Sequence, residues 1–370
     1  VISTTGNAKN IITVGSINRV TAPNINRENV QISSFSSWGP TDDGRIKPDL
    51  VGMGDRVYST ITGGRYSGSY SGTSMATPNV AGSLLLLQEY YAQRHHDTLM
   101  RSATLKGLAC HTALDAGNIG PDYIYGWGLL DMHKAAQTIT NDGINSYINE
   151  DNLVQGQART YTVTATGNEQ LSALIAWTDP EGTPAKDGTI NDRTPKLVND
   201  LDVRITNDGG TSYTPWVLNP ANPAAAATTG DNIRDNIEQV YVPNTVAGAK
   251  YTITVSHKGA LRGGGLQNYS LILTGGSPNG SSVNNDPTDL SSFPVPANNK
   301  LTVLFNVQLP GLLKLSLVNI SGQTVYTYSN TVPAGNFSTE INTSALSNGV
   351  YILKLVTGKQ VLSNKVMVVK

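Results

Sequence analysis

The chain has 370 residues, enough for two or three domains that each bury a core. Its formal net charge is −1 and only 14% of its residues are charged, which excludes the basic surface that holds nucleic acid or anionic lipid. The longest aliphatic run, Leu84–Leu87, is far too short to be a transmembrane segment. A single cysteine, Cys110, excludes an internal disulfide framework and is expected to be buried. Low charge with many Gly, Asn, Ser and Thr is typical of a secreted, β-rich protein.

Residues 1–140 mix apolar strands with helices. Asn10–Ser16 is expected to be a buried strand that ends in a glycine turn. Apolar residues fall on all sides of Thr77–Tyr91, which predicts a helix buried in the middle of a domain. Two further helices are predicted, one over Thr98–Thr112 with Asp97 as N-cap and one that Asp131 caps, ending at Gln137. Helices around a strand core indicate a doubly wound α/β half-domain.

The run Gly72-Thr73-Ser74-Met75-Ala76-Thr77-Pro78 opens the buried helix. A serine in the first turn of a helix lies among unpaired N–H groups, at the positive end of the helix dipole, where developing negative charge is stabilised. Gly72 allows a tight bend into the helix, and Pro78 lies in the first turn, where its missing N–H costs little. The alternative is a simple Ser/Thr helix cap before a core helix.

This run resembles the nucleophile motif of the subtilisin-like serine proteases. Four more segments resemble the same family, namely Asn10–Ser16, Ser33–Pro40, Asp43–Leu50 and Gly120–Asp131, so that the resemblance extends from Val1 to about Thr140. Gly52-Met53-Gly54 departs from the Ala-Pro-Gly of most relatives and exchanges a rigid turn for a looser one. The resemblance implies that Ser74 is the catalytic nucleophile, that its backbone N–H stabilises the oxyanion, and that Ser71, Gly72 and Thr73 line the substrate cleft.

The family's chain order is aspartate, histidine, serine, and no histidine precedes Ser74. All five histidines follow it, and each is expected to be structural or solvated: His95, His96, His111, His133 and His257. The chain also starts at Val1 in the middle of an α/β pattern. We therefore expect the C-terminal part of a longer protease, with the triad Asp and His and the oxyanion Asn upstream. The fragment alone is expected to be nearly inert, because a serine without a base is a weak nucleophile.

From about residue 145 to 275 the apolar period changes to two, which indicates strands of a β-sandwich of jelly-roll type. The expected strands are Arg159–Thr166, Ala173–Trp177, Leu201–Thr206, Glu238–Val242, Lys250–His257 and Tyr269–Thr274. Ala176–Pro180 and Leu197–Asp202 resemble the jelly-roll domain that follows the catalytic domain in some bacterial subtilases and is related to the P domain of proprotein convertases.

Such domains commonly bind calcium. Hard oxygen ligands for a structural calcium would come from Asp179, Asn199, Asp200 and Asp202. The alternative is that these side chains cap turns or bind backbone. The chemistry expected at Ser74 requires no cofactor.

Residues 276–290 contain almost nothing that can be buried and are predicted to be a flexible linker. Residues 291–370 return to a β pattern with two hairpins, Leu313–Tyr328 and Gly349–Val369, the second turning through Thr357-Gly358-Lys359. This module resembles the C-terminal sorting domain of cargo of the type IX secretion system, although Phe293 and Val295 depart from the usual Tyr-Pro-Asn-Pro. The resemblance implies that the secretion machinery is a partner. The alternative is a generic adhesion-type β-sandwich.

The sequence thus predicts a multidomain protein in which an α/β subtilisin-like partial domain (1–140) precedes two all-β sandwich domains (141–275 and 291–370) joined by a linker (276–290). The predicted function is a secreted or cell-surface serine endopeptidase that acts on protein or peptide substrates through an acyl-enzyme at Ser74. The alternative function is a non-catalytic cell-surface binding or adhesion protein, a pseudo-protease.

Overall fold

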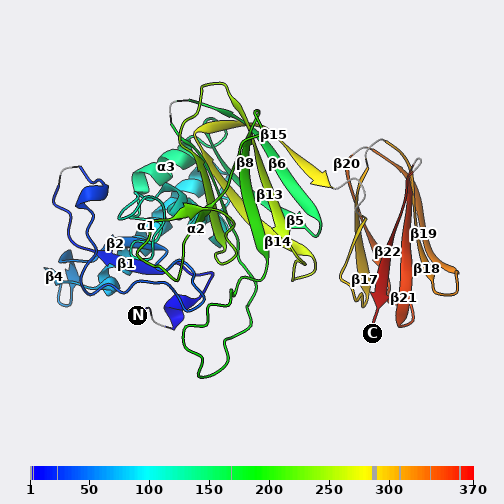
Figure 1. The fold of residues 1–370 in the computed structure, drawn as a ribbon, viewed down its shortest axis with the longest axis horizontal. Helices are drawn as coiled ribbons and strands as arrows, with labels where there is room; N and C mark the ends of the chain where they lie inside the picture. Colours follow the sequence, from blue (N-terminus) through cyan, green and yellow to red (C-terminus); the bar gives the residue numbers. More distant parts are fainter. Residues whose placement is uncertain are drawn as a thin grey trace. The chain divides into compact units, whose positions relative to one another are not determined.

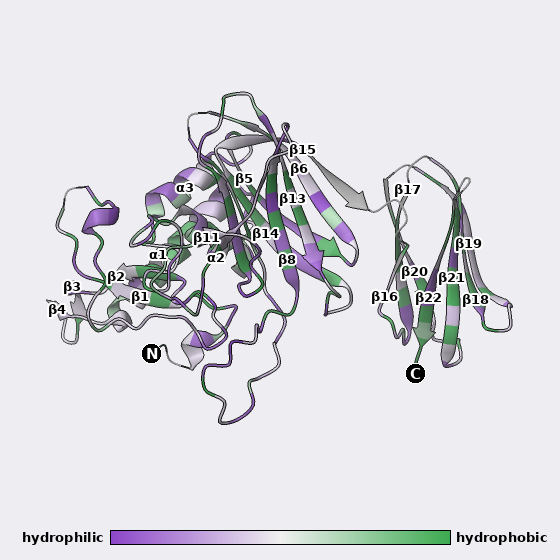
Figure 2. Ribbon diagram, viewed as in Figure 1, coloured by the Kyte–Doolittle hydropathy of each residue, from purple (hydrophilic) through white to green (hydrophobic). Residues whose placement is uncertain are grey.

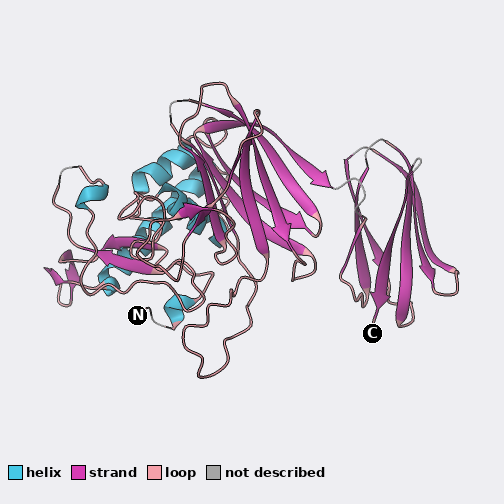
Figure 3. Cartoon of the chain, viewed as in Figure 1, coloured by secondary structure: helices cyan, strands magenta, loops and turns pink. Residues whose placement is uncertain are grey.

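The structure is a computed structural model and describes residues 2, 4–22, 24–167, 169–285, 290–307, 310–333, 335–357 and 360–370. The chain forms two compact units. The first comprises Val1–Asn152, Thr160–Ser256 and Asn268–Ser281, and the second comprises Leu153–Arg159, His257–Gln267 and Ser282–Lys370. Most of the described chain outside three clustered helices is strand or loop (Figure 3).

The first 140 residues of the first unit form an α/β layer. Its sheet is the parallel pair β1 (Val14–Ile17) and β2 (Leu50–Met53), in which Val14 lies opposite Leu50. An antiparallel hairpin follows, and then three α-helices that lie together beside the sandwich strands (Figure 1). Their bounds are β3 Val57–Ile61, β4 Arg65–Tyr70, α1 Thr73–Arg94, α2 Ser102–Thr112 and α3 Met132–Thr140, with short 3-10 turns at η1 Thr5–Asn7 and η2 Arg27–Asn29.

The three predicted helices exist, but one predicted cap is wrong. Asp131 caps α3, because its Oδ1 accepts the Lys134 N–H at 2.9 Å. Asp97 does not cap α2, which begins after Arg101 without a side-chain cap. Asp97 instead belongs to the turn that ends α1, where it has a φ of 61° and its N–H donates to the Ala92 carbonyl at 2.9 Å.

Helix α1 is buried on one side only, which corrects the prediction of a helix surrounded by its domain. Its buried residues follow a single stripe: Ala76, Val80, Leu84, Leu87 and Tyr91. This stripe faces β1, β2, α2 and α3. On the opposite side Leu85 is 71% exposed and Leu86 is 61% exposed, because no element in the described part of the chain covers that side.

The strands between residues 146 and 285 form two large β-sheets and one two-stranded pair, β10-β11. One has the strand order β12-β7-β14-β5, and the other has the order β15-β6-β13-β8-β9. Polar and apolar segments alternate along these strands (Figure 2), as expected for strands with one face in a core. The bounds are β5 Ser146–Val154, β6 Gln157–Ala165, β7 Leu171–Ala176, β8 Asp200–Asn207, β9 Ser212–Tyr213, β10 Trp216–Val217, β11 Thr228–Thr229, β12 Ile237–Val242, β13 Lys250–Lys258, β14 Leu266–Thr274 and β15 Gly276–Asn285. Each of the six strands predicted here is present.

Strand β7 is buried on both faces and joins the sandwich to the helices. All six of its residues are buried, which explains its unbroken apolar run. On one face Leu174 and Ala176 share a core with α1 and α2. Helix α2 approaches closely at Gly107, where a Cβ would come within 2.8 Å of Ile272. Cys110 is buried in this same core, as predicted.

The predicted linker is largely a strand. Residues Gly276–Asn285 form β15, which pairs with β6 at the edge of its sheet. An edge strand needs backbone hydrogen bonds on one side and little apolar burial, so a polar segment can serve as one. The predicted linker residues 286–289 lie outside the described residues.

The last eighty residues of the second unit form a separate sandwich of two sheets, β16-β17-β20 and β19-β18-β21-β22. Alternate residues of facing strands make its core, with Leu301 and Val303 on one side and Leu315 and Leu353 on the other. The bounds are β16 Ser291–Phe293, β17 Lys300–Val307, β18 Gly311–Asn319, β19 Thr324–Val332, β20 Gly335–Asn342, β21 Gly349–Thr357 and β22 Gln360–Val368. Both predicted hairpins are present, although residues 358–359 of the second turn lie outside the described residues.

Candidate functional site

Ser74 is the second residue of α1 and its side chain is exposed. The first N–H groups of an α-helix have no acceptor within the helix, and the Ser74 N–H is one of them. No histidine lies near it among the described residues: His95, at the other end of α1, is about 30 Å away by helical rise. The arrangement provides an exposed hydroxyl and a positive helix end, without a base.

Glycines bring β2 close to the first turn of α1. The Gly72 N–H donates to the Gly54 carbonyl at 2.8 Å. A Cβ on Gly54 would lie 2.5 Å from the Gly72 carbonyl oxygen, and one on Gly52 would lie 2.7 Å from Val80. Gly72 itself has a φ of 155°, which side chains disfavour. The segment 52–54, expected to be a loose turn, therefore fixes the position of the helix that carries Ser74.

A cavity of about 540 Å³ lies between the start of α1 and the β3–β4 hairpin, and Ser74 is part of its wall. The hairpin contributes Tyr58 and Tyr70, whose side chains are largely exposed, and the helix contributes Met75 and Pro78. Sequence reasoning missed the hairpin side of this cavity. The available signal was the presence of three tyrosines, Tyr58, Tyr66 and Tyr70, on either side of the Gly63-Gly64 turn.

The other predicted substrate-binding residues have different surroundings. Ser71, Gly72 and Thr73 are not part of the cavity wall. The Ser71 hydroxyl donates to Asp55 Oδ1 at 2.9 Å and accepts the Arg56 N–H at 2.8 Å. The hydrogen bond from Ser71 lowers the pKa of Asp55. Ser71 therefore fastens the chain before the helix, and its role in binding substrate stays a prediction.

The histidines have structural surroundings. The His95 ring stacks on Tyr91 with centroids 3.8 Å apart, and its Nε2 lies 3.0 Å from Asp142 Oδ2. His111 is buried on α2, where its Nε2 lies 2.9 Å from Thr274 Oγ1. Burial, with a smaller contribution from the charge of Lys134, lowers the pKa of His111 to about 3. His111 is therefore neutral at physiological pH.

A buried ion network anchors the residues just before β2. Asp49 accepts from Lys47 Nζ at 2.6 Å and from the Thr13 N–H at 2.7 Å, and it pairs with Lys106 Nζ at 2.8 Å. Burial alone would raise the pKa of Asp49, but the two ammonium groups lower it. Burial lowers the pKa of Lys47 to about 8. The network ties β2 to α2 and thereby supports the strand under the Ser74 helix.

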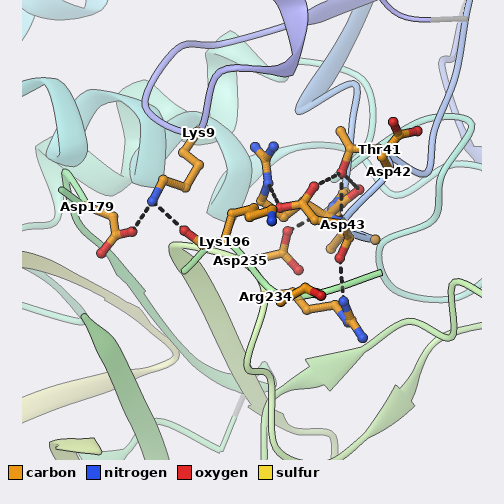
Figure 4. A network of polar contacts seen from close by, with 12 residues as sticks. Lys9, Thr41, Asp42, Asp43, Asp179, Lys196, Arg234 and Asp235 are labelled. Carbon is orange, nitrogen blue, oxygen red and sulfur yellow. Dashed lines mark hydrogen bonds and ion pairs between the residues drawn. The ribbon is translucent and has the colours of Figure 1, made fainter. Parts of the chain in front are cut away.

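Two of the four predicted calcium ligands, Asp179 and Asp202, already form ion pairs within the protein. Asp179 forms a buried ion pair with Lys9, which also donates to the Pro180 and Lys196 carbonyls at 2.7 Å each (Figure 4). Asp179 also accepts the Val198 and Asn199 N–H groups, whereas Asp202 pairs with Arg204 at 2.7 Å. Within the described ranges, no three His, Cys, Asp or Glu side chains lie together as a metal cluster. Calcium binding stays a prediction.

The sandwich is joined to the loop that leads into β2 by Arg193, Arg234 and Asp235. Arg234 donates to the Asp43 carbonyl, and Asp235 Oδ1 accepts the Ile46 N–H at 2.8 Å (Figure 4). Arg193 donates to the Thr41 carbonyl at 2.9 Å. Sandwich residues thus hold the loop from residue 41 to 46 by its backbone, a contact that the sequence did not predict.

Comparison with known proteins gives a family match at each end of the chain. Residues 1–128 match the subtilase family, and residues 291–370 match the secretion system C-terminal sorting domain. The chain therefore carries a subtilase-family segment of the serine-protease kind at its N-terminal end and a type IX sorting domain at its C-terminal end. The sorting domain marks the protein as secreted or displayed at the cell surface and implies involvement of the secretion machinery.

Among curated relatives, the C5a peptidase of Streptococcus pyogenes is 45% identical over 67 residues, which cover 18% of this chain and 6% of that protein. The serine protease/ABC transporter B family protein tagB of Dictyostelium discoideum is 26% identical over 330 residues, covering 69% of this chain and 17% of that protein. The chain thus spans less than a fifth of the length of either relative. A biofilm-associated protein BSP domain is 16% identical, covers 57% of this chain and 29% of that chain, and has a TM-score of 0.20.

The described residues contain no helix that is both long and apolar enough to cross a membrane.

Proposed function

We propose that this chain is the nucleophile-bearing part of a secreted subtilisin-like serine endopeptidase, with Ser74 as the nucleophile. The observation that carries the proposal is the exposed Ser74 hydroxyl at the N-terminal end of a 22-residue helix, in the wall of an open cavity. The subtilase-family match over residues 1–128 supports this assignment.

The proposed reaction follows the serine-protease scheme. A histidine takes the proton from the Ser74 hydroxyl as its oxygen attacks the scissile carbonyl, and the resulting acyl-enzyme is then hydrolysed. The Ser74 N–H at the positive helix end stabilises the oxyanion. The histidine, its aspartate partner and the second oxyanion donor, an asparagine, come from polypeptide outside these 370 residues. Within the described residues, no histidine lines the Ser74 cavity.

The substrate is proposed to be a protein or peptide whose chain lies between α1 and the β3–β4 hairpin. The hairpin presents the exposed rings of Tyr58 and Tyr70 to this cavity. Aromatic rings provide apolar contact with side chains of many kinds. This part of the cavity should therefore accept substrate side chains of many types and should not select for charged ones.

A fluorophosphonate probe, which reacts with activated serines, tests the proposal. The full-length protein should be labelled at Ser74, and Ser74→Ala should abolish the labelling. Ser69→Ala is the matched control: Ser69 lies on the exposed hairpin, is not part of the cavity wall, and should leave the labelling unchanged. The isolated 370-residue chain should not react. A full-length protein that stays unlabelled would favour the non-catalytic surface protein, and strong labelling of the isolated chain would refute the need for outside residues.

A further inference from the structure

A second cavity, of about 450 Å³, lies in the first unit between the helices and the sheet β12-β7-β14-β5. We call it the interlayer cavity. The end of α2, the start of α3 and strands β7 and β12 contribute to its wall. It shares no lining residue with the Ser74 cavity. Its volume lies in the range of small-molecule binding sites.

One wall of the interlayer cavity is aromatic and tightly packed. The rings of Trp216 and Tyr241 stack with centroids 4.9 Å apart and an angle of 19° between their planes. Gly120 lies against the Trp216 ring so closely that a Cβ there would be 3.0 Å from it. These contacts hold the two rings in place, and the stacked pair forms a preformed apolar part of the cavity wall.

The polar part of the wall is oriented by His111. Its Nδ1 lies 3.3 Å from Gln239 Nε2, and its Nε2 lies 2.9 Å from Thr274 Oγ1. The pKa of about 3 keeps the imidazole neutral, so Nδ1 accepts from the Gln239 amide while Nε2–H donates to Thr274. This leaves Gln239 Oε1, which makes no hydrogen bond within the described part of the chain, as an acceptor at the cavity.

The charges of the interlayer cavity leave one cation without a counter-ion. Asp115 accepts from Arg27 at 3.0 Å and from the Gly120 N–H at 3.3 Å, and Asp131 caps α3. Lys134 Nζ, in contrast, makes no ion pair with any described residue, and the buried Arg27 Nε has no acceptor there either. Both acidic side chains are engaged, so an added carboxylate would find an unpaired ammonium group.

We propose that the interlayer cavity binds a carboxylate that carries an aromatic ring and a neighbouring N–H, as the C-terminal aromatic residue of a peptide does. The carboxylate pairs with Lys134, the N–H donates to Gln239 Oε1, and the ring packs against Trp216 and Tyr241. Free N-acyl aromatic amino acids share this chemistry. The proposal is independent of the assignment of Ser74 as a nucleophile.

Calorimetric titration of the chain with N-acetyl-phenylalanine tests the proposal. We expect saturable binding at one site, and binding of N-acetyl-phenylalanine amide, which lacks the charge, should be at least about tenfold weaker. A pentapeptide that ends in phenylalanine distinguishes the two sources: affinity equal to or above that of N-acetyl-phenylalanine identifies peptide termini, and weaker binding identifies the free amino acid. Equal affinity for acid and amide, or no saturable heat with either, would overturn the proposal.

A matched pair of lysine variants locates the site. Lys134→Gln should weaken N-acetyl-phenylalanine binding about tenfold and leave the melting temperature unchanged, because Lys134 is exposed. Lys186→Gln, which removes an exposed charge from a loop outside the cavity wall, should bind like the unmodified chain. Ser74→Ala should also bind normally. Unchanged affinity in a folded Lys134→Gln variant would contradict the proposed placement of the carboxylate.

Discussion

The Gly54 carbonyl accepts a hydrogen bond from the Gly72 N–H at 2.8 Å, and this contact joins the end of β2 to the residue before the Ser74 helix. Both partners are glycines, and the space around Gly54 has no room for a methyl group. The helix start is therefore positioned by backbone-to-backbone contact, with the Asp49 ion network holding the same strand from its other end.

Gly54→Ala should destabilise the chain by about 1–3 kcal/mol, because the new methyl group would overpack against Gly72 and Ser16. Urea unfolding measures this change. Gly82→Ala is the matched control on α1: a Cβ at Gly82 meets no atom within 4 Å, so it should stabilise the helix by up to about 1 kcal/mol. Equal effects of the two variants would contradict the close approach of β2 to α1.

Lys9→Met should destabilise the chain by about 3–5 kcal/mol, because it leaves the Asp179 carboxylate buried without its cation. Adding Asp179→Asn in the same chain should recover part of this loss, since the uncompensated charge is removed. Lys186→Met is the control: it removes a lysine charge at an exposed position and should change the free energy of unfolding little. Additive effects of the Lys9 and Asp179 substitutions would show that the pair is not coupled.

Acid should destabilise the first unit through His111. The folded-state pKa of His111 is about 3 and its ordinary value is 6.5, so between these pH values the unfolded chain binds a proton that the folded chain does not. The free energy of unfolding should therefore fall as the pH drops below 6.5, by up to about 1.4 kcal/mol for each pH unit. His111→Gln should flatten the fall in unfolding free energy between pH 7 and 4.5. His133→Gln, at an exposed position of α3, should keep the original slope.

Calcium binding is tested by melting the chain with calcium and with a chelator. If Asp179, Asn199, Asp200 and Asp202 hold calcium, its binding to the folded state should raise the melting temperature. Asp179 can coordinate calcium only by giving up Lys9, so Lys9→Met should strengthen the effect. Identical melting curves under both conditions would refute the calcium hypothesis.

Local sequence signals predicted the helices and strands well, because each of these segments has a residue pattern of its own. The β7 run is continuously apolar since both of its faces are buried, and Asp131 marks the start of α3 through its own hydrogen bond. Predictions failed where contact with a segment distant in sequence decides the structure or the burial of a residue. Polar β15 is a strand because β6 lies beside it, and half of α1 is exposed because no described element covers it.

The candidate site was predictable only in part for the same reason. The sequence motif placed Ser74 at the start of a helix, as the structure has it. The cavity beside it depends on how the β3–β4 hairpin folds back, which brings Tyr58 near residues twenty positions later in the chain. Lys9 and Asp179 are 170 residues apart, and no local pattern announces that they pair.

The core shared by β7 and α2 makes the sandwich part of the fold that supports Ser74. Cutting the chain near residue 140 would strip the cover from Gly107 and Cys110 and open an apolar face to water, inviting aggregation. The sandwich layer therefore covers one face of the helical layer, and the two are expected to fold as a single unit.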